Sequence, residues 1–314
     1  MLPDPQHIIK AREAALELGI EEDAIQKVLA IASQFYHDEQ SKEHPKMTRE
    51  SLAALGILYK YRNPDFDYNW EILEDQKIYF ADPKSFNDPF DSNIKLRFDL
   101  LEVDELRKRF DRQVKIQQPG AGYFLRKPQV DRYIANVYNP VTHDAAVSKW
   151  IESFTGKMRM FCICPDKANI LLWSHYANNH KGFAIGFDPN KFYDFWSVNK
   201  GFLLGHIAYR NEYPILLPPA DTDIETKQDI VVTVTNVKSK IWSYEQEVRM
   251  TVFDGPEKLS FDAELITEIV IGCKTNPKHK DRILDIVAAK YPHASVYQAK
   301  LSRDSFALDF DKIR

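Results

Sequence analysis

Three charged side chains stand at intervals of two residues in the last third of the chain. They are Glu245, Glu247 and Arg249, and they lead into the run Met-Thr-Val-Phe. Because residues two apart lie on the same face of a strand, we expect the three side chains on one side. Paired carboxylates suit proton transfer near neutral pH, since each raises the pKa of the other, and a guanidinium binds anions. The pattern predicts Glu247 and Glu245 as catalytic residues and Arg249 as a ligand contact.

Three further segments offer ligand contacts. The first is a short strand with two cations on one face and two tyrosines on the other, the second is an aromatic strand, and the third is a helix. The candidates are Lys60 and Arg62 in the first, Tyr79 and Phe80 in the second, and His175 and Tyr176 in the third. A cation can hold a phosphate group, with Arg preferred for contact through two bonds, and an aromatic ring can pack on a flat ligand.

A turn rich in aromatic residues follows the strand that carries Tyr79. Its sequence is Phe-Asn-Asp-Pro-Phe-Asp over residues 86–91. Asn and Asp side chains in such turns bind their own backbone, so Asn87 and Asp88 are predicted to build a structural loop near the site. We expect this loop at the rim of the site that contains Glu247.

The composition is that of an ordinary globular protein. The chain has 314 residues, of which 44% are hydrophobic and 28% are charged, and its net charge is −4. This balance gives no indication of nucleic-acid binding through bulk charge. No run approaches the roughly 18 apolar residues of a spanning helix, and the first residues lack the features of a secretory signal. We therefore expect a cytoplasmic protein that does not enter a membrane.

The cysteines are predicted to be reduced core residues. There are three, Cys162, Cys164 and Cys273, and the first two share one face of an apolar strand. No nearby histidine supplies a recognisable zinc spacing, so no metal site is predicted.

The order of the elements favours an α+β fold. Residues 1–45 have the pattern of a helical hairpin and a linker, which we interpret as an N-terminal appendage. Residues 46–314 then predict one domain with a mixed, largely antiparallel sheet and flanking helices, and a helical insertion at about 99–157. A further helix is expected over residues 168–180, with Ile170, Trp173 and Ala177 as its buried stripe.

Residues 55–275 resemble the bacterial family catalogued as domain of unknown function 2971. Four motifs in the same order carry this resemblance: Leu58–Arg62; Ile78–Phe80 with Phe86–Asp91; Trp173–Ala177 with His180–Gly182; and Tyr244–Arg249. The name of this family states no chemistry.

A second resemblance is to ADP-ribosyltransferases, including the poly-ADP-ribose polymerases. Lys77–Asp82 resembles the segment in which a tyrosine stacks against nicotinamide. Glu245–Glu247 resembles the Glu-x-Glu turn of arginine-specific members, whose second carboxylate is catalytic. The chain departs from this pattern because Lys60 or Arg62 stands where those enzymes keep His or Arg, and because no Ser-Thr-Ser follows on the second strand.

This resemblance implies an ADP-ribosyltransferase-like fold and an enzyme that uses NAD as a substrate. Such enzymes include toxins and effectors of defence against phage, and their target is a macromolecule or partner protein. Cleavage of the nicotinamide–ribose bond gives the ribose oxocarbenium character, which a nearby carboxylate stabilises. Glu247 would supply this carboxylate, Arg62 or Lys60 would hold the pyrophosphate, and Tyr79 would pack on nicotinamide.

Two other interpretations fit the same residues. In the first, the chain is a catalytically silent module that binds a nucleotide or a partner, and the three charged residues form an ion-pair network with one of the two strand cations. In the second, Asp88 and Asp91 join the two glutamates around the metal of a nuclease.

Overall fold

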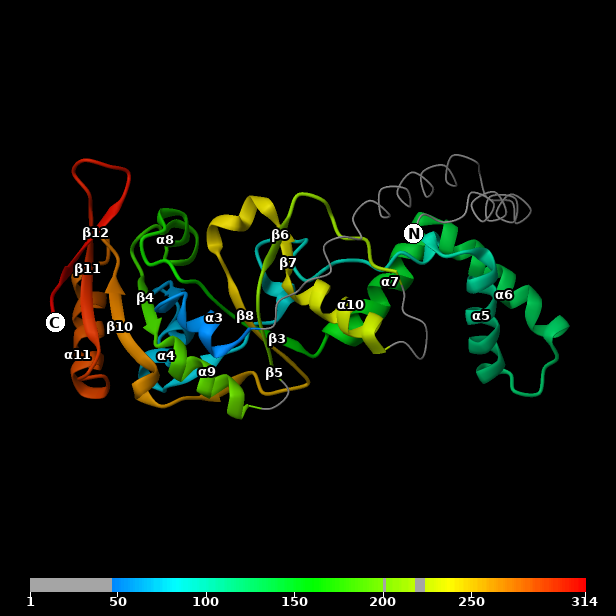
Figure 1. The fold of residues 1–314 in the computed structure, drawn as a ribbon, viewed down its shortest axis with the longest axis horizontal. Coiled ribbons are helices and arrows are strands. Elements are labelled where there is room, and N and C mark those ends of the chain that lie inside the picture. Colours follow the sequence, from blue (N-terminus) through cyan, green and yellow to red (C-terminus); the bar gives the residue numbers. More distant parts are fainter. Residues whose placement is uncertain (1–46, 200–201, 218–223) are drawn as a thin grey trace. The chain divides into compact units, whose positions relative to one another are not determined.

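The computed structural model describes residues 47–199, 202–217 and 224–314 (Figure 1). The predicted helical appendage at residues 1–45 lies outside these ranges. The described chain folds as two compact units. One contains residues 93–156 together with part of 213–234, and the other contains residues 47–92, 157–212 and 235–314. All the predicted site residues belong to the second unit, and the bounds of the predicted domains remain a prediction.

A five-stranded sheet forms one half of the second unit. Its strands, in spatial order, are β1 (Leu58–Arg62), β4 (Phe183–Phe187), β10 (Ile266–Ile271), β11 (Ser295–Leu301) and β12 (Leu308–Lys312). Only the β10–β11 pair is parallel, and the other three pairs are antiparallel.

The remaining strands of this unit form three smaller sheets. They are β3 (Met158–Ile163), β8 (Val248–Phe253) and β5 (Phe202–His206) in an antiparallel sheet, β2 (Lys77–Tyr79) with β9 (Lys258–Ser260), and β6 (Ala208–Arg210) with β7 (Val237–Ser239). The edge of β3 that does not pair with β8 has one isolated bridge near each of its ends. Tyr59 of β1 bridges to Cys164, and Ala81, just after β2, bridges to Met160. Strands β1 and β2 therefore meet different ends of one strand edge.

Short helices surround these sheets. In the second unit they are α3 (Arg49–Ala53), η2 (Asp67–Asn69), α4 (Glu71–Glu74), η3 (Pro83–Ser85), α8 (Ile170–Tyr176), α9 (Pro189–Val198), η5 (Lys240–Glu245), η6 (Ala263–Leu265) and α11 (Pro277–Lys290). The first unit holds η4 (Phe98–Leu100), α5 (Val103–Gln117), α6 (Tyr123–Tyr138), α7 (Pro140–Thr155) and most of α10 (Ile224–Asn236). No helix in the described ranges has the length and apolarity that crossing a bilayer requires.

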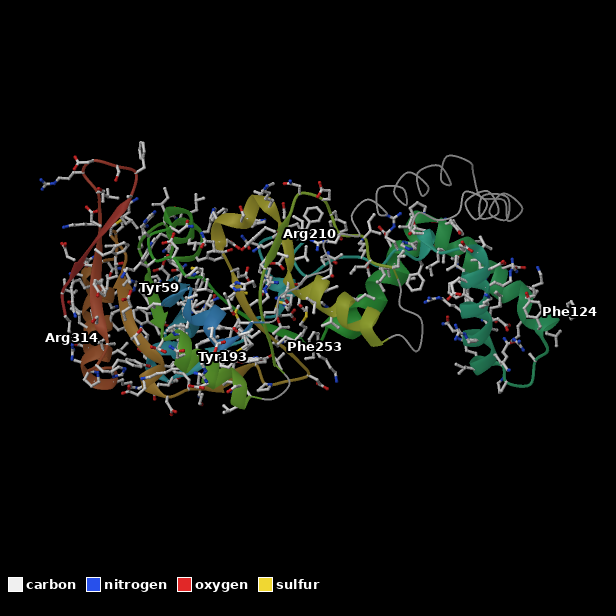
Figure 2. All side chains as sticks on the ribbon, viewed as in Figure 1. Tyr59, Phe124, Tyr193, Arg210, Phe253 and Arg314 are labelled. Carbon is white, nitrogen blue, oxygen red and sulfur yellow. The ribbon has the colours of Figure 1, made fainter. Side chains whose placement is uncertain are left out.

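Both faces of the five-stranded sheet are buried. On one face Phe183, Ile185 and Phe187 of β4 join a core cluster with α9 and α11, whereas Ala184 faces the opposite cluster. Strand β1 alternates in the same way, with Leu58 in the first cluster and Tyr59 in the second. Successive residues of these strands therefore face opposite clusters, as the period of two in a β-strand requires. Figure 2 labels Tyr59 among the side chains of this unit.

The predicted fold class is confirmed in its general form, since the described chain is α+β with mixed, mostly antiparallel sheets. The predicted helix at 168–180 is shorter than expected. It begins at Ile170 with Asn169 as N-cap and ends at Tyr176, because the three residues 178–180 have left-handed backbone angles. Within the expected stripe, Trp173 and Ala177 are fully buried but Ile170 is 41% exposed.

Candidate functional site

Arg249 lies at the centre of a buried group of charges. Its side chain is fully buried on β8. It donates two hydrogen bonds to the carboxylate of Asp91, each 2.9 Å long, and a third of 2.6 Å to Glu247. A fourth, of 2.8 Å, goes to the carbonyl oxygen of Thr235. Arg249 therefore joins the loop after β2 to the entry of β8.

Lys238, from β7, completes this group. Its ammonium lies 2.6 Å from Glu245 and 3.4 Å from both Glu247 and Asp91. The second oxygen of Glu245 accepts a bond of 2.7 Å from the hydroxyl of Tyr176. We call these five residues, Asp91, Lys238, Glu245, Glu247 and Arg249, the charge cluster. The four oxygens of the two glutamates thus all face a cation or a hydroxyl of the protein.

The glutamates do not share one strand face as the sequence predicts. Strand β8 begins at Val248, and Gln246 has a left-handed backbone with a φ of 45°. Glu245 is therefore the last residue of η5, while Glu247 lies beside Arg249. The left-handed residue between them turns the two carboxylates toward Lys238 from different directions.

The two cations keep Glu247 ionised. Burial alone would raise the pKa of Glu247, but Arg249 and Lys238 outweigh burial and lower this pKa to about 2. The carboxylates in turn raise the pKa of Lys238 against the effect of burial. The pairing of the glutamates was expected to raise a carboxylate pKa, whereas the pKa of Glu247 is lowered because the cations Arg249 and Lys238 lie beside it.

The loop at residues 86–92 contacts the charge cluster. Asp88 accepts the backbone N–H of Phe90 at 2.9 Å, which is the geometry of an Asx turn. The Phe86 ring lies 5.5 Å from the guanidinium of Arg249, and Asp91 binds this guanidinium directly. Asn87 lies in this loop and is exposed. The loop is thus on the Glu247 side of the fold.

Lys60 and Arg62, which we call the β1 cations, differ from the charge cluster because they have no carboxylate partner. Among the described residues, none lies within ion-pair distance of either one. Lys60 donates a bond of 2.7 Å to the carbonyl oxygen of Cys162, and the Nε–H of Arg62 is buried without an acceptor. Burial and repulsion by Arg62 lower the pKa of Lys60 to about 8, and burial lowers that of Arg62 to about 10.

The β1 cations lie close to the charge cluster across β3. Cys162 pairs with Arg249 in the β3–β8 ladder, and its carbonyl oxygen binds Lys60. Glu247 is near enough to raise the pKa of Lys60, although it is outside ion-pair distance. Burial and Glu247 together raise the pKa of the Cys162 thiol to about 12, so this thiol is not a nucleophile near neutral pH.

The other predicted ligand contacts have different environments. Tyr79 is 36% exposed on β2. Phe80, which was predicted as a ligand contact, is fully buried and packs on Phe161 in the core. His175 is exposed at the end of α8, where its ring lies 6.3 Å from that of Trp242, while Tyr176 points at the charge cluster.

Sequence reasoning missed Lys238 and gave Asp91 a different role. Lys238 precedes Glu245 and Glu247 by seven and nine residues. Residues an odd number apart lie on opposite faces of a regular strand, so this spacing does not predict their contact. Asp91 was grouped with metal ligands, but it binds Arg249 instead. In the described part of the chain, no group of three His, Cys, Asp or Glu side chains is arranged to hold a metal ion.

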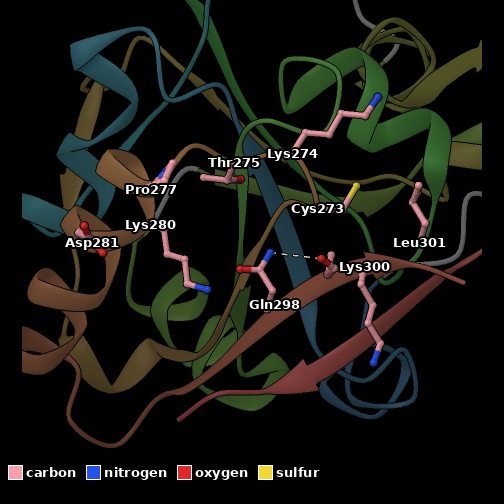
Figure 3. A pocket seen from close by; sticks show the side chains of 10 residues that line it. Cys273, Lys274, Thr275, Pro277, Lys280, Asp281, Gln298, Lys300 and Leu301 are labelled. Atoms are coloured by element: carbon pink, nitrogen blue, oxygen red, sulfur yellow. Dashed lines mark hydrogen bonds between the residues drawn. The ribbon is translucent and has the colours of Figure 1, made fainter.

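A separate surface hollow of about 600 Å³ lies beside the start of α11 (Figure 3). Its lining includes Lys274, Lys280, Lys300 and Gln298. The three lysines extend in different directions, and Lys300 is paired with Asp311. None of the predicted site residues lines this hollow.

Residues 172–250 match the model of a family described as "Protein of unknown function (DUF2971)". This match confirms the first resemblance over the part of the chain that contains α8, Glu247 and Arg249. No curated protein and no solved structure gives a significant match to the chain. The resemblance to ADP-ribosyltransferases has no support from these comparisons and remains a hypothesis.

Proposed function

We propose that the β1 cations bind the diphosphate of a nucleotide, that this nucleotide is NAD, and that the reaction is ADP-ribosyl transfer. The observation that carries the proposal is the pair of neighbouring, desolvated cations, for which the described part of the chain offers no carboxylate within ion-pair distance. Moving a cation out of water is costly unless an anion or hydrogen-bond acceptors compensate it. A diphosphate supplies both charge and acceptor oxygens, and a guanidinium matches phosphate oxygens through two bonds.

Glu247 is the group best placed to act on the ribose. In the proposed reaction the bond between nicotinamide and the ribose carbon breaks, and nicotinamide leaves with the electron pair. The acceptor then bonds to that carbon and releases its proton. An ionised carboxylate stabilises the positive charge that develops on the ribose. A pKa of about 2 keeps Glu247 ionised at neutral pH, but a ribose hydroxyl must first displace one of its present partners.

Arg62→Gln is expected to weaken binding of ADP and NAD by about 10- to 100-fold, because a charge-assisted hydrogen bond contributes roughly 1.5–3 kcal/mol. Isothermal calorimetry at neutral pH measures this change. Arg303→Gln removes the same charge from an exposed position and should leave binding unchanged. Wild-type affinity should also fall as the pH rises above about 8, since Lys60 then loses its proton. Equal affinities of the wild type and Arg62→Gln for ADP and NAD would contradict the proposal that the β1 cations bind the diphosphate.

A non-catalytic nucleotide-binding module is the second candidate. The charge cluster favours it, because the oxygens of Glu245 and Glu247 are already paired within the protein. The cluster would then fix the loop at residues 86–92 against β8 and take no part in a reaction.

Incubation with NAD labelled on its adenylate side, in cell lysate, distinguishes these candidates. ADP-ribosyl transfer predicts labelled macromolecules with the wild type and at least a 100-fold loss of label per folded molecule with Glu247→Gln. Melting curves supply the folded fraction, since this variant also removes a buried charge. Free ADP-ribose as the product would indicate a glycohydrolase instead. Nucleotide binding without any consumption of NAD would support the silent module.

A further inference from the structure

Two aromatic rings lie exposed and stacked in the loop that follows β1. Phe66 is 48% exposed and Tyr68 is 58% exposed. Their ring centroids are 5.4 Å apart and the ring planes differ by 17°. Large rings that share an exposed position indicate a surface that contacts a ligand or partner. We call this pair the ring platform.

The backbone under the ring platform is firmly held. Trp70 is fully buried, and its indole N–H donates to the carbonyl oxygen of Pro64 at 2.8 Å. The Asn69 side chain donates to the carbonyl oxygen of Asn63 at 2.9 Å, and its backbone N–H donates to Phe66 at 3.0 Å. A ligand that stacks here therefore meets rings that are already ordered, which lowers the entropy cost of binding.

The ring platform lies next to the β1 cations along the chain. Its loop starts directly after Arg62 and folds back toward β1, since the Asn69 side chain binds the carbonyl oxygen of Asn63. Tyr68 also acts on the pKa of Arg62. Lys60, in contrast, binds the carbonyl oxygen of Cys162, whose strand partner Arg249 binds Glu247. Two residues of a strand span about 7 Å, which is the scale of a diphosphate. The order along this face is thus Glu247, Lys60, Arg62 and the ring platform.

We propose that the ring platform stacks the adenine base of the nucleotide whose diphosphate the β1 cations hold. This inference rests on the proposed function. In NAD the diphosphate separates the nicotinamide ribose from the adenosine. Because the nicotinamide end must approach Glu247, the adenosine end extends past Arg62 toward Phe66 and Tyr68. Bases of all kinds stack on exposed aromatic rings. In the proposed nucleotide, NAD, the base at this position is adenine.

Calorimetry with three probes tests this inference: ADP, adenosine and inorganic pyrophosphate. Phe66→Ala and Tyr68→Ala are each expected to weaken binding of ADP by about 5- to 100-fold and to leave pyrophosphate unchanged. Tyr68→Phe keeps the ring and should bind ADP within about threefold of the wild type. Phe306→Ala removes a fully exposed ring elsewhere and serves as the control.

The outcomes separate the two proposals. If ADP and pyrophosphate bind with equal affinity and neither alanine variant changes this, the ring platform is overturned while the diphosphate site remains. If adenosine binds, the ring variants abolish its binding, and Arg62→Gln changes nothing, the ring platform is supported and the diphosphate site fails. If the alanine variants weaken pyrophosphate as much as ADP, the rings act through the fold, and the inference is wrong.

Discussion

Arg249→Met is expected to lower the free energy of unfolding by about 3–5 kcal/mol, the usual cost of removing one partner from a buried ion pair. The substitution leaves Asp91 and Glu247 buried with Lys238 as their only cation, and it removes the donor to Thr235. Since folded proteins are stable by only 5–15 kcal/mol, much of the variant should be unfolded or insoluble. Urea unfolding of the purified protein measures the difference.

A double-mutant cycle separates the pairing energy from the loss of packing. Asp91→Asn in the Arg249→Met background should cost less than in the wild type, because the cation that binds Asp91 through two hydrogen bonds is then already missing. Arg303→Met is the control for the loss of one positive charge at an exposed site. If Arg249→Met unfolds at the same urea concentration as Arg303→Met, the charge cluster does not hold the fold together.

Acid should weaken the same interactions. The folded pKa of Glu247 is lowered to about 2, below its ordinary value of 4.5, so its contribution to stability is complete above pH 4.5. This contribution is lost as the pH falls from 4.5 toward 2. Urea midpoints of the wild type should decline over this window.

Trp173→Ala is expected to cost about 3–5 kcal/mol of stability, the range found for truncating a buried tryptophan. Trp173 is fully buried and its ring meets that of Tyr61 edge-on at 5.0 Å. Its indole N–H also donates to the carbonyl oxygen of Lys167 at 2.7 Å, which fixes the loop before α8. Thermal melting and the yield of soluble protein report the loss.

Tyr79→Ala is the matched comparison, because Tyr79 is 36% exposed and should lose about 1 kcal/mol or less. Trp173→Phe should fall between the wild type and Trp173→Ala. Equal losses for Trp173→Ala and Tyr79→Ala would contradict the different burial of the two side chains.

Local patterns predicted much of the fold, because alternation and turn chemistry act over a few residues. The opposite faces of β1, the Asx turn at Asp88 and the pairing of Glu247 with Arg249 all follow from neighbours in the sequence. The burial of Phe80 was missed because an aromatic strand residue fits a core and a ligand site equally well by its type alone.

The partners of the charge cluster depend on contacts that no local pattern contains. Asp91 is 158 residues from Arg249, and the two meet because the loop after β2 returns beside β8. Lys238 lies on β7, whose partner β6 is 29 residues earlier. That no carboxylate of the described residues pairs with Lys60 or Arg62 is equally a property of the assembled fold, so the sequence indicated two cations but not that their charges would be left without an ion pair there.

The different ends at which β1 and β2 meet β3 have a consequence for how this fold can diversify. Strands β1 and β2 follow each other in the chain but do not pair with each other. The length of the segment between them therefore does not set the register of any sheet. Residues 65–68, which are all exposed and lie between the buried Pro64 and the buried Trp70, can therefore be lengthened, shortened or replaced with little effect on the sheets. If the ring platform stacks the base as proposed, exchange of this short segment would change the ligand preference while the strands and the charges behind them stay unchanged.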